Sequence, residues 1–240
     1  LQRLRAPVVT TLHTVLTTPD DAQRRVMDEI VTRSARLVVM ADKGRSILQD
    51  VYGVAPERIS LVPHGAPDRA FVDPAMAKHD LRLADRTLLI TFGLLGPGKG
   101  IETAIRAMPK LVRKHPKILY LIVGATHPTL RRQEGERYRE SLAALAHDLG
   151  LVERVRFIDR FLSLDELLQY LSACDIYVSP YPNEAQIASG TLAYAVALGK
   201  AVVSTPFWYA RELLADRCGV LVPYGASDKL AAAVCELIAD

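Results

Sequence analysis

Short apolar runs alternate with longer segments of helical pattern along almost the whole chain. In the second part, apolar runs of strand length predict strands at 88–92, 118–123, 155–158, 176–179, 201–204 and 220–222. Helical patterns lie between and after them, at about 100–113, 134–149, 164–173, 190–198, 208–215 and 227–239. Apolar strands joined by helical crossovers are typical of parallel sheets that are buried on both faces. Residues 87–240 are therefore predicted to form one doubly wound α/β domain.

Local signals support two of these helices. Apolar residues at 142, 145, 146 and 149 form one helical stripe, and Gly150 follows as a helix stop. Ser163 and Glu166 fit the S-x-x-E capping box at the start of another helix.

The first part of the chain carries fewer strands. Apolar runs near 8–12, 37–40 and 59–62 predict strands, with helices near 21–33 and 43–52. A free-standing doubly wound domain normally has about five or six strands. Residues 1–65 are therefore predicted to be the back half of a second Rossmann-like domain, and the weakly patterned residues 66–86 a linker. Since the sequence starts in mid-pattern without methionine, we expect a fragment.

Composition excludes several classes of protein. Half of the 240 residues are apolar and 24% are charged, which excludes a disordered chain and a collagen repeat. The net charge of +3 is too small and dispersed for a nucleic-acid partner. The apolar runs are too short for a transmembrane segment, and no secretory leader is visible. The three cysteines lack metal-ligand spacing, so we expect reduced thiols, a cytoplasmic protein and no metal site.

The first candidate site follows the strand that ends at Phe92. Its sequence, GLLGPGKG, places Gly98 and Lys99 directly before a helix. Glycine lets the backbone approach a ligand, and a helix start offers free N–H groups to phosphate. The string nearly matches a P-loop, but Gly100 occupies the place of the magnesium-binding hydroxyl. A phosphate cradle is favoured over a P-loop NTPase, and a plain turn with a solvated lysine remains the alternative.

The second candidate site follows the strand that ends at Ser179. Ser189 is a good N-cap, and Gly190 and Thr191 would open the next helix, which makes a second anion site. Two helix starts at one crevice suit a diphosphate. Glu184 lies on the same loop, between the two suspected phosphate sites, and becomes a candidate functional residue. An ordinary capped helix and a solvated carboxylate remain the alternatives.

Two histidines complete the candidates. His13 ends the first strand, and His64 sits at a tight turn in LVPHG. Either is compatible with a structural hydrogen-bonding role, and the residues alone leave this open.

Five pieces, in this order and spacing, resemble the family-4 retaining glycosyltransferases (group 1), which have the GT-B fold with two Rossmann-like domains. The pieces are Leu61–Gly65, Phe92–Gly100, Leu121–Gly124, Cys174–Pro180 and Ala195–Val203. The resemblance implies that residues 1–65 belong to the acceptor-side domain and 87–240 to the nucleotide-sugar domain.

The resemblance also implies roles for residues. Lys99 would contact the donor diphosphate, and His13 would lie near the transferred sugar. The loop from Glu184 to Thr191 would hold sugar and phosphates, and Arg160-Phe161 would meet the nucleotide base.

This chain departs from the family pattern at three positions. Leu94 stands where members usually carry arginine. Gln186 and Tyr194 stand where members usually carry two glutamates. A shifted loop would let Glu184 bind the sugar, and Tyr194 would reach a ribose hydroxyl.

The predicted function is transfer of a hexose, with retention and without metal or cofactor, from a UDP-, GDP- or ADP-sugar to an acceptor hydroxyl. His13 and Glu184 are the catalytic candidates. The donor-binding candidates are Gly98, Lys99, Arg160, Phe161, Gln186, Ser189, Gly190, Thr191 and Tyr194. An inactive nucleotide-sugar-binding module and a sugar-nucleotide epimerase of the same fold remain alternatives.

Overall fold

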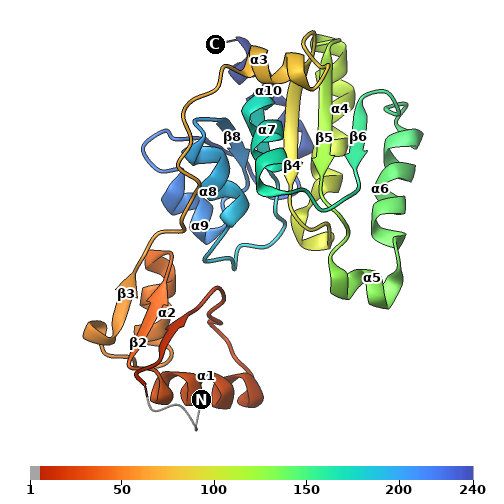
Figure 1. Cartoon of the computed structure of the whole chain (residues 1–240). Coiled ribbons are helices and arrows are strands. Elements are labelled where there is room, and N and C mark those ends of the chain that lie inside the picture. Colours follow the sequence, from red (N-terminus) through yellow and green to blue (C-terminus); the bar gives the residue numbers. More distant parts are fainter. Residues whose placement is uncertain (1–5, 240) are drawn as a thin grey trace. The chain divides into compact units, whose positions relative to one another are not determined.

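The computed structural model describes residues 6–239, which form two compact units (Figure 1). The first unit contains the described residues up to Gly65 together with two short later segments, Glu184–Gly190 and Phe207–Leu213. The second unit contains Ala66–Asn183, Thr191–Pro206 and the chain from Leu214 onward. The sequence pattern did not predict that these two later segments pack with the first unit, because nothing in it indicates contacts between segments so far apart.

The first unit is built on a parallel three-stranded sheet in the order β1-β2-β3. Leu37 of β2 pairs with Thr10 of β1 and with Ile59 of β3. Its elements are β1 (Val9–Thr11), α1 (Asp21–Arg33), β2 (Arg36–Val39), α2 (Asp42–Asp50), η1 (Pro56–Arg58), β3 (Ile59–Leu61) and, from the later segments, α9 (Trp208–Leu213). Asp20 and Gln23 form a capping box at the start of α1.

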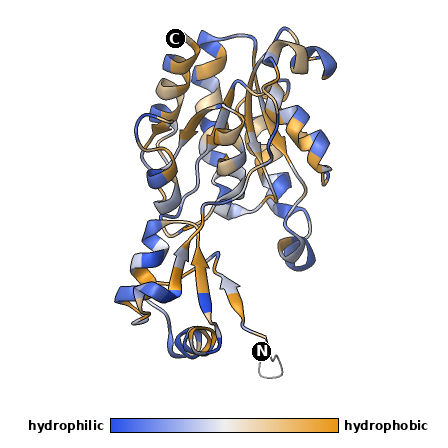
Figure 2. Cartoon of the chain, turned by 60° about the vertical axis from the view of Figure 1, so that its left-hand side comes forward, coloured by the Kyte–Doolittle hydropathy of each residue, from blue (hydrophilic) through white to orange (hydrophobic). Residues whose placement is uncertain are grey.

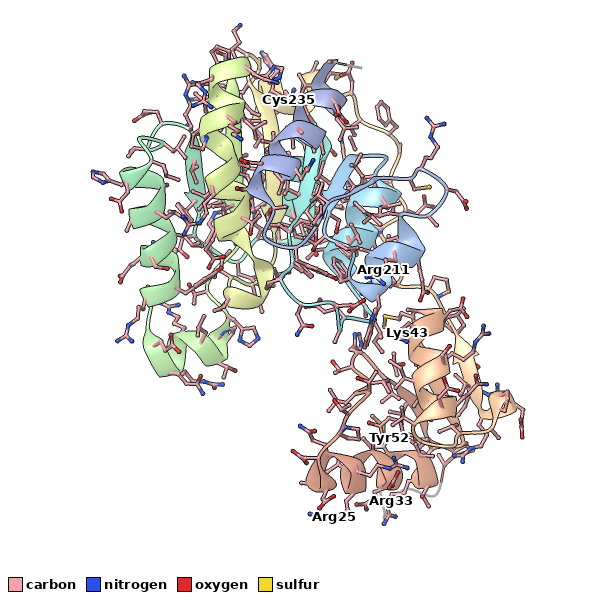
Figure 3. The ribbon with its side chains drawn as sticks, turned by 180° about the vertical axis from the view of Figure 1, so that it is seen from behind. Arg25, Arg33, Lys43, Tyr52, Arg211 and Cys235 are labelled. Atoms are coloured by element: carbon pink, nitrogen blue, oxygen red, sulfur yellow. The ribbon has the colours of Figure 1, made fainter. Side chains whose placement is uncertain are left out.

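Helix α2 receives its cap from a distant residue. Its N-cap residue is Ala41, which has no side chain that could accept a hydrogen bond. Instead the carboxylate of Glu212 accepts from the backbone N–H groups of Asp42, at 2.7 Å, and Lys43, at 2.8 Å. The ammonium of Lys43, a residue labelled in Figure 3, also lies 5.3 Å from the centre of the Trp208 ring. Residues 207–213 are thus attached to the start of α2 by charge and hydrogen bonds.

The second unit is built on a parallel six-stranded sheet in the order β6-β5-β4-β7-β8-β9. Helices cover both faces, with α7 on one side and α4 and α10 on the other (Figure 1). The strands are β4 (Thr87–Phe92), β5 (Ile118–Val123), β6 (Val155–Ile158), β7 (Ile176–Ser179), β8 (Ala201–Ser204) and β9 (Val220–Leu221). The helices are α3 (Pro74–Asp80), η2 (Pro97–Lys99), α4 (Ile101–Lys114), α5 (Pro128–Glu134), α6 (Arg137–Asp148), α7 (Leu164–Ala173), α8 (Gly190–Ala197, whose first residue groups with the first unit) and α10 (Ser227–Ala239).

The strand order places a topological switch point between β4 and β7. The chain builds outward from β4 through β5 to β6, then returns to lay β7 on the other side of β4. Ile90 of β4 pairs with Tyr177 of β7, so the carboxyl ends of the two strands lie side by side. In open parallel sheets this is where ligands bind.

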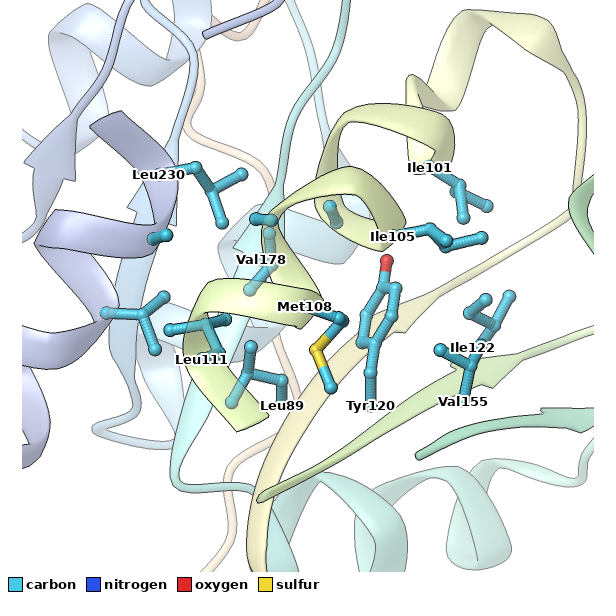
Figure 4. Close-up of a cluster of buried hydrophobic side chains, with 14 of the residues drawn as sticks. Leu89, Ile101, Ile105, Met108, Leu111, Tyr120, Ile122, Val155, Val178 and Leu230 are labelled. Atoms are coloured by element: carbon cyan, nitrogen blue, oxygen red, sulfur yellow. The ribbon is translucent and has the colours of Figure 1, made fainter. Parts of the chain in front are cut away.

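The core of the second unit explains why these strands form. All six residues of β5 are buried, as expected for a central strand covered on both faces. One buried cluster joins side chains of β4, β5 and α4, among them Tyr120 and Met108 (Figure 4). The strands of both units are coloured as predominantly hydrophobic in Figure 2.

Residues 66–86, the predicted linker, contain a short helix and group with the second unit. Helix α3 lies inside this stretch, with the Asp73 side chain accepting from Ala75 N–H at its start and Pro74 at its first position. Lys78 of α3 forms an ion pair at 2.7 Å with Asp175. A helix of seven residues is too short to show a clear apolar period, which is why the pattern missed it.

The predicted helix over 134–149 is also corrected. Residues 128–148 form two helices, α5 and α6, which are separated at Gly135, where φ is +67°. Across residues 6–239, none of the helices combines the length and the apolar character that a membrane crossing requires.

Candidate functional site

The loops after β4 and β7 meet at the switch point, and two glycines make this possible. Gly100 has a φ of +61°, and a Cβ there would lie 2.1 Å from the carbonyl oxygen of Pro180. Gly93 has a φ of +118°, and a Cβ there would lie 3.2 Å from Nζ of Lys99 and 3.2 Å from Cγ2 of Thr191. The absent side chain at Gly93 therefore leaves room for a lysine and a threonine from two different loops.

Lys99 and Thr191 are joined through Tyr181. The ammonium of Lys99 donates to the Tyr181 hydroxyl at 2.6 Å, and that hydroxyl lies 3.1 Å from Oγ1 of Thr191. Thr191 is the second residue of α8. The structure thus brings the predicted lysine and the predicted helix start into one cluster at the end of the sheet.

The charge of Lys99 is not neutralised within this cluster. Among the residues that the structure describes, no carboxylate lies within ion-pair distance of Lys99, and its hydrogen-bond acceptor is a neutral phenol. A helix start adds a partial positive charge in the same place. The cluster can attract an anion of high charge density, such as a phosphate group.

An apolar pocket of about 180 Å³ adjoins the Lys99 cluster at the carboxyl ends of β4 and β5. Phe92, Gly93 and Leu94 form one side, and Phe161 with Leu162 forms another. Phe161 is 81% exposed. A flat apolar wall next to an anion site suits a ligand that has both an aromatic ring and phosphate.

The positive charge of Arg160 is paired with a carboxylate. Its guanidinium pairs with the Glu166 carboxylate at 2.8 Å. Hydrogen bonds from Arg160 and then from the Ser163 backbone lower the pKa of Glu166 to about 2. Ser163 and Glu166 form the predicted capping box of α7, so Arg160 is tied to the start of that helix.

Glu184 and Gln186 lie in the first unit, on the later segment that leads to α8. The carboxylate of Glu184 pairs with Arg211 at 2.8 Å. The backbone carbonyls of Glu184 and Gln186 accept from the N–H groups of Trp208 and Tyr209, at 3.1 Å and 3.0 Å. Arg211 is a partner that the sequence analysis missed, because no local pattern links residues so far apart.

Gly190 lies against His64 inside the first unit. A Cβ at Gly190 would approach Nε2 of His64 to 2.8 Å, and Nδ1 of His64 lies 2.7 Å from the Gly65 carbonyl oxygen. His64 therefore packs against the start of α8, a contact that the sequence did not indicate. His13 is exposed at a bend after β1, and its role stays a prediction.

The remaining candidates take the following places. Ser189 is buried just before α8, and Gly98 is exposed on η2. The ring of Tyr194 on α8 lies 6.4 Å from that of Phe92, at an angle of 38°. Their proposed contacts with a donor stay predictions. No group of histidine, cysteine and acidic side chains within residues 6–239 is arranged to hold a metal ion.

A larger cavity, of about 450 Å³, lies at the opposite edge of the same sheet. Lys78, Asp175 and Lys200 line it. Lys200 is 8% exposed and donates to the carbonyl oxygen of Ser172 at 2.6 Å. Because Ser172 lies in the last turn of α7, Lys200 acts as a cap for the end of that helix. Burial lowers the pKa of Lys200.

Comparison with known proteins decides the family. The family model of the glycosyl transferases group 1 matches residues 86–240, which is more than half of the chain. The chain belongs to the group 1 glycosyl transferases. The prediction of a group 1 glycosyltransferase is therefore confirmed.

Curated relatives of this group 1 member carry glycosyltransferase names. A D-inositol 3-phosphate glycosyltransferase of Acidothermus cellulolyticus is 32% identical over 201 residues, which cover 76% of this chain and 44% of the relative. A GDP-mannose-dependent alpha-(1-6)-phosphatidylinositol monomannoside mannosyltransferase of Mycolicibacterium smegmatis is 29% identical over 205 residues, covering 82% and 51%. The chain spans about half the length of these relatives.

Solved structures support the fold. The crystal structure of Anabaena HepE in complex with UDP gives a TM-score of 0.82 at 21% identity, covering 98% of this chain and 64% of that one. Sucrose-phosphate synthase from Thermosynechococcus elongatus gives 0.80 at 22% identity, covering 100% and 60%. The GT-B fold predicted for this chain is thereby confirmed.

Proposed function

We propose that this chain carries the donor site of an enzyme that transfers a hexose from a nucleoside-diphosphate sugar to an acceptor hydroxyl, with retention and without a metal. The observation that carries the proposal is the Lys99–Tyr181–Thr191 cluster at the switch point between β4 and β7. Relatives named for GDP-mannose and a structural neighbour that holds UDP support the choice of donor class. A cytoplasmic location is part of the same proposal.

The chemical demand of such a transfer is to stabilise the leaving diphosphate. Charge develops on the phosphate oxygens as the bond to the sugar breaks, and fixed donors aimed at that charge lower the barrier. Each such donor is worth on the order of 3 kcal/mol. Lys99 supplies a full positive charge, and the N–H groups of Gly190 and Thr191 at the start of α8 supply partial charges.

Other residues take supporting roles in this proposal. The apolar pocket beside Phe161 receives the base, and the backbone of Arg160 and Phe161 meets its edge. Glu184 orients sugar hydroxyls, which requires exchange of part of its pairing with Arg211. Tyr194 meets the ribose.

Calorimetric titration of the chain with UDP, GDP and ADP tests the donor site. We expect one of the three to bind, and Lys99→Ala to weaken it at least tenfold, which corresponds to about 1.4 kcal/mol. Lys110→Ala is the matched control, because Lys110 on α4 forms an exposed ion pair with Asp228 away from the site. Equal nucleotide affinity of the Lys99→Ala and Lys110→Ala proteins would refute the proposed role of Lys99 in diphosphate binding.

Two observations favour a second function, that of a binding module without transfer. Leu94 contributes an apolar side chain to the pocket, and Glu184 already has a charged partner. Incubation with labelled nucleotide sugars separates the two functions. Transfer or slow hydrolysis of the donor indicates the enzyme, whereas tight binding with neither indicates the module.

A further inference from the structure

Tyr181 is the residue that links the two halves of the Lys99 cluster. It follows β7 by two positions and is 3% exposed. Its hydroxyl lies 2.6 Å from Nζ of Lys99 and 3.1 Å from Oγ1 of Thr191. One buried oxygen therefore contacts both the lysine after β4 and the first turn of α8.

The direction of one of these hydrogen bonds follows from chemistry. A lysine ammonium can only donate, so the phenol oxygen accepts from Lys99. In the second hydrogen bond, between the hydroxyls of Tyr181 and Thr191, either oxygen can be the donor. The ammonium also lies 4.7 Å from the ring centre, as it must when bonded to the phenol oxygen, so the two distances describe a single contact.

The backbone of Tyr181 is held as firmly as its hydroxyl. Its carbonyl oxygen accepts from Oγ1 of Thr205 at 2.6 Å, and Thr205 is buried. The N–H of Thr205 in turn donates to the Ser179 carbonyl oxygen at 3.1 Å. Tyr181 is thus held at the end of the sheet both by its hydroxyl and by its backbone carbonyl.

A neutral partner has a particular value for Lys99. A carboxylate in this place would fix the lysine equally well but would cancel its charge. The phenol restricts a side chain with four rotatable bonds while it leaves the positive charge in place for an anion. Groups held in the binding geometry beforehand lose less entropy when the ligand arrives.

We propose that Tyr181 is a positioning residue for diphosphate recognition, which holds the Lys99 ammonium and the first turn of α8 in one geometry before the donor binds. This inference rests on the proposed function, because it assumes that Lys99 meets a diphosphate.

The first variant is Tyr181→Phe, which keeps the ring and removes the oxygen. We expect binding of the preferred nucleoside diphosphate to weaken about three- to tenfold in calorimetry. Binding of the matching nucleoside, which lacks phosphate, should stay unchanged. Tyr120→Phe is the matched control, because it removes another buried phenol of the same unit, one that donates to Oγ1 of Thr91. It should lower the melting temperature without changing diphosphate affinity.

A double-mutant cycle tests whether Tyr181 affects diphosphate binding through Lys99. In the Lys99→Ala background, Tyr181→Phe should weaken diphosphate binding less than it does in the unmodified protein, because the lysine that it positions is gone and only its contact with α8 remains. A loss as large as in the unmodified protein would overturn the inference. If Lys99→Ala weakens binding and Tyr181→Phe does not, only the inference fails. If Lys99→Ala itself has no effect, the proposed donor site fails as well.

Thr191→Val provides a second variant if Tyr181→Phe does not fold. It keeps the shape of the side chain and removes the oxygen that the phenol contacts. We expect a two- to fivefold loss of diphosphate affinity and an unchanged nucleoside affinity. Unchanged diphosphate binding in this variant would overturn the link between Tyr181 and α8.

Discussion

The two edges of the β4–β9 sheet both carry a cavity and lysines, yet their lysines are used differently. At the amino edge, Lys78 pairs with the Asp175 carboxylate, and Lys200 caps the end of α7. At the carboxyl edge, Lys99 meets the neutral phenol of Tyr181. The charges of Lys78 and Lys200 at the amino edge are engaged in contacts that stabilise the fold. The charge of Lys99 at the carboxyl edge remains available to a ligand.

Cavity size does not mark the donor site that we propose. The cavity at the amino edge is the larger, about 450 Å³ against about 180 Å³ for the apolar pocket near Lys99. What marks the carboxyl edge is the close approach of two loops at Gly100 and Gly93. The close contact of the two loops holds the Lys99 ammonium, which has no carboxylate partner among the described residues, near the start of α8. Three variants test this contrast.

The largest effect is expected at Gly100, where the two loops touch. Gly100→Ala places a Cβ 2.1 Å from the Pro180 carbonyl oxygen, in a backbone conformation that favours glycine. We expect a loss of unfolding free energy of about 3 kcal/mol in urea titration, from overpacking and left-handed strain together. Gly98→Ala is the matched control, because a Cβ there meets nothing within 4 Å. Similar stability of the two variants would contradict the close approach.

A smaller effect is expected at the amino edge. Lys78→Met removes the partner of Asp175 from a pair whose side chains are 13% and 28% exposed. We expect a loss of about 2 kcal/mol of unfolding free energy, between the values for exposed and buried pairs. Nucleoside-diphosphate affinity should not change. A Lys78→Met protein with impaired nucleotide binding would show that the two edges are coupled.

The smallest effect is expected at Glu166, which holds Arg160 at the carboxyl edge. Because the folded protein lowers the pKa of Glu166 from 4.5 to about 2, its ionised form stabilises the fold above pH 4.5. That contribution is lost as the pH falls toward 2. Urea midpoints of the unmodified protein and Glu166→Gln should therefore differ more at pH 6 than at pH 2.5. A difference that is the same at both pH values would refute the ion pair.

Much of this fold is readable in the sequence because its strands are buried on both faces. β4, β5 and β7 appear as predominantly apolar runs. Because ligands bind at the carboxyl ends of parallel strands, the sequence also predicted that Lys99 and Thr191 lie at one site. The capping box at Ser163 was readable because it is local.

The remaining features depend on packing between distant segments. Tyr181 follows Lys99 by 82 positions, and its role is set by the way two loops pack at the end of the sheet. The pairing of Glu184 with Arg211 needs two segments that the sequence gives no reason to join. Helix α3 was missed because seven residues hold too few turns for an apolar period.

The cap of α2 has a consequence for the order in which this chain matures. Glu212 lies 170 positions after Asp42, and its carboxylate accepts a hydrogen bond from the Asp42 N–H. The first turn of α2 has no side-chain cap from its own N-cap residue. During synthesis at about 5–20 residues per second, roughly 10 to 30 s pass before the ribosome makes Glu212. For that interval the nascent helix depends on water to satisfy its leading amides, and its first turn is completed late in translation.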